Sequence, residues 1–333
     1  MSYLFVDDDG AHINYESNYI IVKSKDGMIR KLPVETVEAI YLFSSVQVTS
    51  QCVVQCLKRG INISYYSKGG AYFGRLQSTN HINVSRQRKQ ARLANTDFSL
   101  GLAKRIIRGK IHNQEVVLQR YARSRNINID AEIIAMKQSL NKIDSCNKVD
   151  EIMGYEGNAA KHYFEGLSWL VENDFAFKGR SKQPPKDEFN SMLSLGYSIL
   201  MNDIYSKLEN KGLNPYFGFI HSDKEKHPTL ASDMIEEWRA TIIDSMVMSM
   251  INGHEIFIDD FYHDIDMPGF YLNKSGMKKF LAKLDGKLRT ETKYLTYVDY
   301  PVSFRRAIDL QIGQLAKAID EEDYTIYNPL WLR

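Results

Sequence analysis

The chain has 333 residues, of which 44% are hydrophobic, so it is long enough to form two domains with separate cores. Its three cysteines cannot all pair, they form no zinc-type Cys/His pattern, and no apolar run approaches the roughly 18 residues of a membrane span. These features exclude a disulfide framework, a structural zinc site and a membrane protein, and we expect a cytoplasmic location.

The first 80 residues predict a small β-rich domain. The segments 19–22, 39–43 and 61–66 are short, rich in β-branched or aromatic residues, and bounded by turn residues, as strands are. One helix is expected before the last of them, because Thr49 and Ser50 can cap its start and Gly60 can end it. A turn at 68–70 then begins a final hairpin.

The pattern changes after the polar stretch 77–84. From Ser85 onward, apolar residues recur three, four and seven positions apart, which is the period of amphipathic helices. A loop is expected at 179–187, because two consecutive prolines cannot continue a helix. The predicted fold class is therefore α+β multi-domain: a β-rich N-terminal domain over 1–80, a linker and first helix over 81–92, and an all-α C-terminal domain over 93–333.

Charge is unevenly distributed along the chain. The formal net charge is only +2, but the segment 86–125 contains eleven basic residues and two acidic ones. The basic residues are Arg86, Arg88, Lys89, Arg92, Lys104, Arg105, Arg108, Lys110, Arg120, Arg123 and Arg125. Such a block can neutralise the phosphates of DNA, although a solvated helix surface has the same composition.

Two acids, Asp233 and Glu236, stand three positions apart on an expected helix. Ser232 can cap this helix, and a start as early as Pro228 is also open. The two carboxylates would repel each other on one helix face, and a divalent cation would turn that repulsion into binding. Oxygen ligands favour Mg²⁺ or Mn²⁺, and the imidazole of His221, in the preceding loop, shifts the balance toward Mn²⁺.

A third acid, Glu156, is expected to open a helix that runs to Trp169. The glycine and alanines beside it leave room for other backbone or substrate to approach. The helix dipole alone also favours an acid in a first turn, so these residues leave a structural role for Glu156 open.

Several motifs, in order along the chain, resemble the CRISPR-associated spacer-acquisition integrase/endonuclease family over nearly the whole length. The motifs are the strand-helix-strand segment 40–70, the basic helices around Gln90 and 110–114, Glu156–Ala160, 179–190, 212–216 leading into His221, and Asp233–Arg239. The resemblance implies that Glu156, His221 and Glu236 are metal ligands and that Asp233 assists catalysis. This chain has Lys182-Gln183 where the family often has two basic residues. The difference is expected to affect DNA affinity more than membership of the family.

The resemblance implies a reaction in which the 3′-hydroxyl ends of short duplex DNA attack the CRISPR repeat by metal-dependent transesterification. Expected partners are double-stranded DNA, a second copy of the chain and a small ferredoxin-like CRISPR-associated adaptation protein. The β-rich domain, with Tyr65, Tyr66, Tyr72 and Phe73, is the expected dimerisation surface. The expected DNA contacts are Arg86, Arg88, Lys89, Arg92, Lys104, Arg108, Lys110, Arg180 and Lys182.

Two alternatives remain at this point. A structure-specific, metal-dependent nuclease acting on branched DNA in repair would use the same ligands with water as the nucleophile. A DNA-binding scaffold that has lost catalysis would need none of them.

Overall fold

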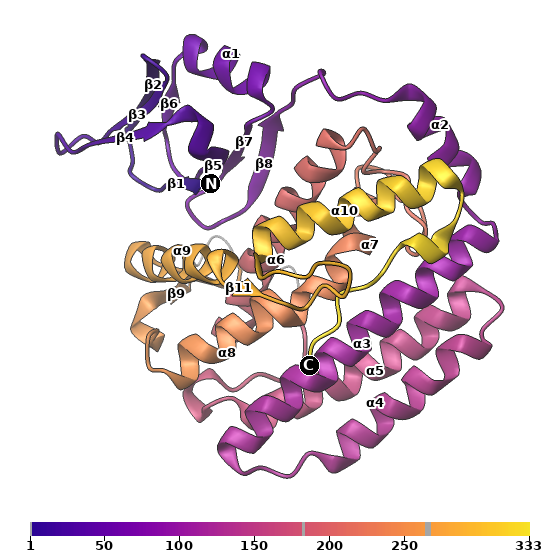
Figure 1. Ribbon diagram of the computed structural model, residues 1–333. Coiled ribbons are helices and arrows are strands. Elements are labelled where there is room, and N and C mark those ends of the chain that lie inside the picture. Colours follow the sequence, from indigo (N-terminus) through magenta and orange to yellow (C-terminus); the bar gives the residue numbers. More distant parts are fainter. Residues whose placement is uncertain (1, 182–183, 264–267) are drawn as a thin grey trace. The chain divides into compact units, whose positions relative to one another are not determined.

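The computed structural model describes residues 2–181, 184–263 and 268–333 (Figure 1). The chain divides into two compact units, Met1–Ile82 and Asn83–Arg333. The first contains strands β1 to β8 and the second is mostly helical, so the predicted change from a β-rich to a helical region is confirmed.

The first unit contains two four-stranded sheets. Its strands are β1 (Ser2–Val6), β2 (His12–Glu16), β3 (Tyr19–Lys23), β4 (Ile29–Pro33), β5 (Val37–Leu42), β6 (Gln47–Val48), β7 (Asn62–Tyr66) and β8 (Tyr72–Leu76), with the 3₁₀ turn η1 (Val34–Thr36) before β5. One sheet has the order β1-β5-β7-β8, parallel except for the final hairpin, and the other has the order β4-β3-β2-β6. The three strands named from the sequence are confirmed as β3, β5 and β7.

Alternation along the strands and helix α1 (Ser50–Arg59) together build the core of this unit. Ile40 and Leu42 of β5 lie in the core, and Tyr41 between them points to the other face of the sheet. Cys52 and Cys56 are buried there as free thiols. The helix ends as the sequence predicts, because Thr49 Oγ1 accepts a hydrogen bond from Cys52 N (3.3 Å) and Gly60 adopts a left-handed φ of 68°.

The second unit is built from nine α-helices in the described residues. They are α2 (Val84–Leu93), α3 (Asp97–Arg125), α4 (Asp130–Lys142), α5 (Val149–Leu170), α6 (Glu188–Asn210), α7 (Thr229–Trp238), α8 (Ser245–Asn252), α9 (Lys274–Arg289) and α10 (Phe304–Glu321). A π-helical segment, η4 (Arg239–Asp244), connects α7 to α8. Short 3₁₀ turns are η2 (Ile143–Ser145), η3 (Asn173–Phe175), η5 (Ile258–Asp260) and η6 (Tyr324–Ile326).

The second unit also contains two small antiparallel pairs, which the all-α expectation did not include. They are β9 (Phe261–His263) with β10 (Phe270–Leu272), and β11 (Glu291–Thr292) with β12 (Val302–Ser303). Each strand has only two or three residues, too short for the period-2 pattern that identifies strands in a sequence. In the described ranges, no helix combines the length and apolar character needed to cross a membrane.

Helix α3 organises the second unit. It packs against α4, α5 and α7, and Figure 1 shows α3, α4 and α5 side by side. The C-terminal segment also lies against α3. A Cβ added at Gly109 would be 2.9 Å from the Cβ of Pro329, so glycine is needed for this close approach.

A buried carboxylate, Glu237, fixes the C-terminal segment to α7. Its Oε1 accepts a hydrogen bond from Tyr327 Oη (2.9 Å), and its Oε2 accepts one from the backbone N of Leu330 (2.8 Å). Gln311 donates a third hydrogen bond to Oε2. Burial raises the pKa of Glu237 to about 8, although these donors lower it.

We expect the stability of Glu237→Gln, relative to that of the wild type, to increase as pH rises. An acid whose pKa is raised by folding stabilises the folded state at pH values below its unfolded pKa of about 4.5. This stabilisation is lost as the pH rises through the folded pKa. The loss at alkaline pH is on the order of 3 to 5 kcal/mol. The melting temperature of Glu237→Gln minus that of the wild type should therefore rise between pH 5 and roughly pH 9. A difference that stays constant across this range would show that Glu237 does not titrate there.

Candidate active site

Glu156 lies well inside helix α5. The helix begins at Val149, so the expectation that Glu156 opens it is wrong. The acids Asp150 and Glu151 occupy the true first turn, and the helix dipole acts mainly within that turn. The dipole therefore does not explain an acid at position 156.

Helix α7 carries two acids with different surroundings. It begins at Thr229 after Pro228, which is the earlier of the two starts that the sequence left open. Ser232 is therefore not the cap, and its Oγ lies 2.8 Å from His227 Nε2. Met234, Ile235 and Trp238 are buried, as predicted. Asp233 and Glu236 are also buried, and both need polar partners.

Asp233 holds the loop that carries His221. Its Oδ2 accepts hydrogen bonds from the backbone N of Phe219 (2.6 Å) and of Ile220 (3.1 Å). Its Oδ1 lies 3.1 Å from the backbone N of His221 and 2.7 Å from the Nδ1 of the same residue. Gly218 permits this approach, because an added Cβ would lie 2.9 Å from Asp233 Oδ2. Asp233 is thus positioned to orient the imidazole and leave Nε2 facing the other acid of α7.

Lys110 lies between two carboxylates from different helices. Its Nζ is 2.5 Å from Glu236 Oε2, and it also contacts Glu156 Oε1. The side chains of Lys110, Glu156 and Glu236 are only 8%, 12% and 3% exposed. Both carboxylates contact one nitrogen, so these oxygens lie within roughly 6 Å of each other, the sum of two charge-assisted contacts.

Glu236 is the centre of the charged cluster. Its Oε1 lies 3.2 Å from an Arg239 guanidinium nitrogen and 3.8 Å from His221 Nε2. Burial alone would favour the neutral acid, but Arg239, Lys110 and His221 lower the pKa of Glu236 to about 2. Burial likewise opposes the charge of Lys110, and Glu236 and Glu156 raise its pKa above the ordinary value. Both groups are therefore ionised at neutral pH.

His221 connects this cluster to solvent. Its side chain is 30% exposed, far more than Glu236 beside it. Burial lowers the pKa of His221, but its hydrogen bond to Asp233 and the nearby acids raise it overall. The imidazole is therefore open to solvent, whereas the carboxylate of Glu236 beside it is not.

The donor set fits a divalent cation once Lys110 withdraws. In the ranges 2–181, 184–263 and 268–333, no three His, Cys, Asp or Glu side chains already form a metal-binding group. The positive charge between the carboxylates is instead the Lys110 ammonium. Two carboxylates and an imidazole whose second nitrogen is held by Asp233 are the ligand types that bind Mn²⁺ or Mg²⁺.

Sequence reasoning missed Arg239, Tyr197 and Asp244 as residues near this site. The Arg239 guanidinium lies 5.1 Å from the ring centre of Tyr197, and that of Arg180 lies 5.2 Å from the same ring. The Tyr197 hydroxyl donates to the buried carboxylate of Asp244, which ends the π-helical segment. Arg239 could have been found from its spacing, because it follows Glu236 by three positions and directly continues α7 as the first residue of η4.

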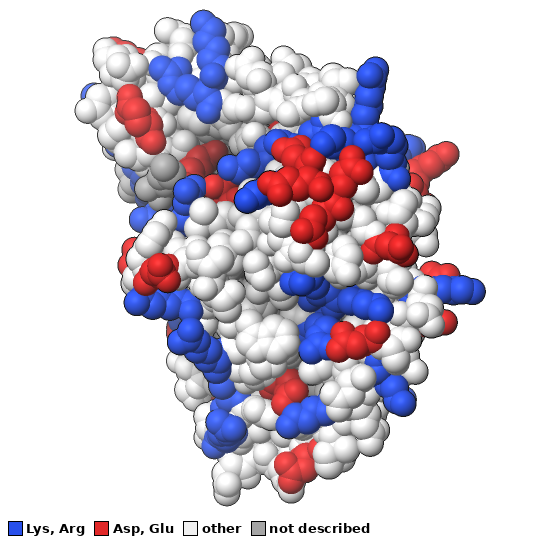
Figure 2. Space-filling model, turned by 45° about the vertical axis from the view of Figure 1, so that its right-hand side comes forward, with Lys and Arg blue, Asp and Glu red and all other residues white. Residues whose placement is uncertain are grey.

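Several of the basic residues expected to bind DNA contact acidic residues or backbone of this chain. Arg86 pairs with Asp320 at 2.6 Å, Lys89 donates to the backbone oxygen of Asp320, and Arg92 pairs with Glu322 at 3.1 Å. Arg88 is exposed. Figure 2 shows that on this face Lys and Arg form separate groups, with Asp and Glu among them, rather than one continuous positive stripe.

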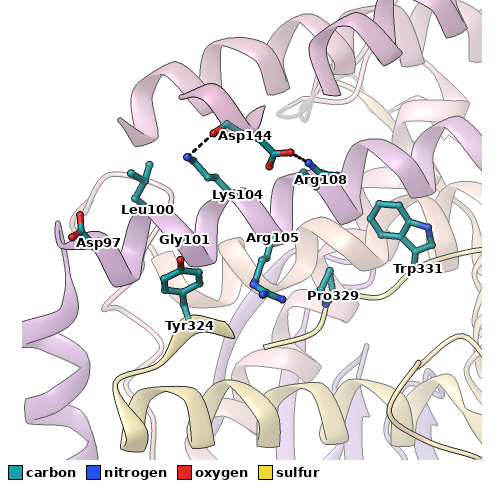
Figure 3. Close-up of a pocket in the computed structure, with 10 residues that line it drawn as sticks. All are labelled: Asp97, Leu100, Gly101, Lys104, Arg105, Arg108, Asp144, Tyr324, Pro329 and Trp331. Carbon is teal, nitrogen blue, oxygen red and sulfur yellow. Dashed lines mark hydrogen bonds and ion pairs between the residues drawn. The ribbon is translucent and has the colours of Figure 1, made fainter. Parts of the chain in front are cut away.

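The remaining candidates from the basic block lie at a pocket and at the cluster. Lys104 donates to the backbone oxygen of Asp144 (2.9 Å), and Arg108 pairs with the carboxylate of the same residue. They line a pocket of about 660 Å³ between α3 and the C-terminal segment, with Trp331 on its other side (Figure 3). Lys110 is the buried residue described above.

The loop 179–187 contains two of the residues expected to contact DNA, Arg180 and Lys182. Arg180 is largely internal, because it donates to Asn190 Oδ1 (2.8 Å) and Ser194 Oγ (3.1 Å). Lys182 lies outside the described residues. The described parts of this loop contain no helix, as predicted.

Comparison with known proteins identifies relatives of the whole chain. The family model "CRISPR associated protein Cas1" matches residues 4–286. A CRISPR-associated endonuclease Cas1 from Mycobacterium tuberculosis (strain CDC 1551 / Oshkosh) is 35% identical over 322 residues, which cover 96% of this chain and 94% of the relative.

Solved structures share the fold. A casposase bound to its integration product has a TM-score of 0.85 at 20% identity and covers 98% of this chain and 93% of its own. A Cas6-RT-Cas1–Cas2 complex has a TM-score of 0.83 at 23% identity; all of this chain is covered, and it spans 36% of that chain. At these identities the likeness is one of fold.

The family match and the curated relative define an endonuclease or integrase of CRISPR adaptation. The chain belongs to the CRISPR-associated protein Cas1 family. The resemblance drawn from the motifs is confirmed, and the alternative of a branched-DNA repair nuclease is not favoured. The roles of individual site residues stay predictions.

Proposed function

We propose that this chain joins the 3′-hydroxyl ends of short duplex DNA to the CRISPR repeat by metal-assisted transesterification at Glu156, His221 and Glu236. One observation carries the proposal: an acid from α5 and an acid from α7 meet at a single buried cation, Lys110, with His221 Nε2 beside them. These residues come from distant parts of the sequence, and a site for a divalent ion accounts for their convergence.

The metal would be held by one carboxylate from Glu156, one from Glu236 and Nε2 of His221. Nucleases of this family are generally metal-dependent, and this donor set suits Mn²⁺ or Mg²⁺. When bound, such an ion supplies Lewis-acid stabilisation of the phosphate charge that develops during phosphoryl transfer.

The other residues of the cluster act through position and charge. Asp233 holds the imidazole of His221 in one orientation through Nδ1. Arg239 brings a guanidinium next to Glu236, where a phosphate oxygen would approach. The attacking hydroxyl belongs to DNA, so no side chain of this protein has to act as a nucleophile.

Double-stranded DNA would contact the pocket that Lys104 and Arg108 line. Arg105 lies on the same wall, and Trp331 adds an aromatic surface, a combination suited to phosphates and bases. The pocket and the buried cluster both use residues of helix α3. The exposed Arg88 on α2 would add a further phosphate contact.

We also propose that the chain works as a homodimer together with a small ferredoxin-like adaptation protein. The similarity in fold to a Cas1–Cas2-containing complex supports a second CRISPR protein as partner. The first unit, with the exposed Tyr72 and Phe73 on β8, is the proposed surface for self-association. Of the other two aromatic residues expected there, Tyr66 is buried and Tyr65 is half-buried, so Tyr66 is not part of that surface.

A joining assay tests the proposed reaction. The wild-type protein, its adaptation partner, a supercoiled plasmid with one repeat and short labelled duplexes are incubated with Mn²⁺. The expected result is plasmid covalently joined to the labelled strand at the repeat. Nicked plasmid without attached label would contradict the proposal and favour hydrolysis by water.

A further inference from the structure

A second basic pocket lies between the C-terminal half of α3, helix α8 and helix α9. Its volume is about 620 Å³. The α9 residues Lys283, Gly286 and Lys287, together with Thr290 just after the end of α9, line it at a helical spacing and so share one face. The α3 residues Val117, Arg120, Tyr121 and Ser124 do the same, and Ser245, Met246 and Ser249 contribute from α8.

The charge inside this pocket is not balanced. Three cations, Arg120, Lys283 and Lys287, line it, and no acid does. Lys283 has an outside partner, Glu255, at 2.5 Å, and Arg120 donates to the backbone oxygen of Arg333. In the part of the chain that the structure describes, Lys287 has no carboxylate partner, and its Nζ lies 5.3 Å from the ring centre of Phe304.

Burial, together with the nearby positive charges of Arg120 and Lys283, lowers the pKa of Lys287 to about 8. The same three cations would be stabilised together by one bound anion. The pocket around Lys104 differs here, because Asp144 lies on its wall and contacts both Lys104 and Arg108.

We infer that the pocket formed by Arg120, Lys283 and Lys287 binds a phosphate group, with the hydroxyl of Ser249 as a further hydrogen-bond donor. The inference rests on the proposed function in one respect, that DNA is taken as the source of the phosphate. Arg120 follows Lys110 by ten residues on α3, about 15 Å along the helix axis, which equals the rise of about four base pairs.

Two substitutions test the pocket by opposite means. Lys287→Met removes one charge and keeps the side-chain length. Gly286→Glu places a carboxylate at the pocket wall, where an added Cβ meets nothing within 4 Å. Replacing glycine inside a helix favours folding, so a loss of binding in Gly286→Glu would not come from misfolding. The controls are Lys278→Met on the exposed side of α9, and Gly313→Glu on α10, where an added Cβ also meets nothing.

The measurement is the affinity for a short duplex as a function of salt concentration, with EDTA present so that the candidate metal site does not contribute. Each lost phosphate contact lowers the slope of log affinity against log salt by about one. We expect this decrease in Lys287→Met and Gly286→Glu but not in the controls. A parallel thermal-shift titration with pyrophosphate identifies a small-molecule source.

The outcomes separate clearly. Unchanged DNA slopes, together with pyrophosphate stabilisation that both variants lose, would support a phosphate site and assign it to a small compound. Wild-type slopes and wild-type pyrophosphate response in both variants would overturn the inference, and would leave an acidic protein segment as the alternative occupant. A failure of the wild-type protein in the joining assay would concern the proposed function alone, because these titrations need no catalysis.

Discussion

Glu156→Gln should abolish the joining of DNA ends and leave DNA binding nearly unchanged. The amide keeps the size of the side chain but removes one negative ligand from the proposed metal site. A bound metal supplies several kcal/mol of transition-state stabilisation, so we expect a rate loss of roughly a thousandfold, about 4 kcal/mol. His221→Ala should have a similar effect, because Nε2 of His221 is the third proposed ligand.

The measurement is the rate of label transfer to the repeat plasmid, with duplex affinity measured separately in EDTA. Glu165→Gln is a matched control, because Glu165 is exposed on the same helix α5. We expect the control to join DNA at the wild-type rate and all variants to bind duplex within a few-fold of the wild type. Full joining by Glu156→Gln or His221→Ala would remove these residues from the site.

Lys110→Met should make the protein much more dependent on metal for its stability. In the absence of metal, this substitution leaves the buried carboxylates of Glu156 and Glu236 without the ammonium between them. Removing one partner of a buried ion pair typically costs about 3 to 5 kcal/mol. A divalent ion at the same place would restore the balance, because ion and ammonium compete for the same oxygens.

Thermal unfolding in EDTA and in Mn²⁺ measures this competition. The rise in melting temperature on adding Mn²⁺ should be larger in Lys110→Met than in the wild type, since no lysine has to be displaced. Lys137→Met is the control, because Lys137 pairs with Glu115 but its side chain is 54% exposed. Equal Mn²⁺ effects in wild type and Lys110→Met would show that the metal does not bind between these carboxylates.

The sequence predicted the local features of the fold better than its long-range contacts. Helix α1 was predicted with both ends because Thr49 and Gly60 act within a few residues of it. The start of α5 was misplaced by seven residues, since Lys148 precedes the helix and provides no side-chain cap. Strands β9 to β12 are too short to show a period of their own.

The candidate site was only partly accessible from the sequence. The spacing of Asp233 and Glu236 and the nearby His221 suggested a metal site, but Glu156 was connected to it only through a family resemblance, because no local pattern connects residues 80 positions apart. Asp233 was expected beside Glu236 on one helix face, but contacts within the fold direct it to the loop at His221. Lys110 was taken for a phosphate contact, but it is buried in α3 and lies between the carboxylates of Glu156 and Glu236.

The basic segment 86–125 shows a different limit of prediction from sequence. Charge counting finds positive side chains but not their partners, and Arg86, Lys89 and Arg92 contact residues near the end of α10 more than 200 positions away. The block therefore contributes to tertiary structure as well as to the proposed binding of DNA.

Anomalous diffraction from crystals soaked in Mn²⁺ would locate the proposed metal. We expect one manganese ion about 2 Å from carboxylate oxygens of Glu156 and Glu236 and from Nε2 of His221, with the Lys110 ammonium displaced. A Lys110 ammonium still in contact with both carboxylates, at a Mn²⁺ concentration that supports joining, would contradict this expectation.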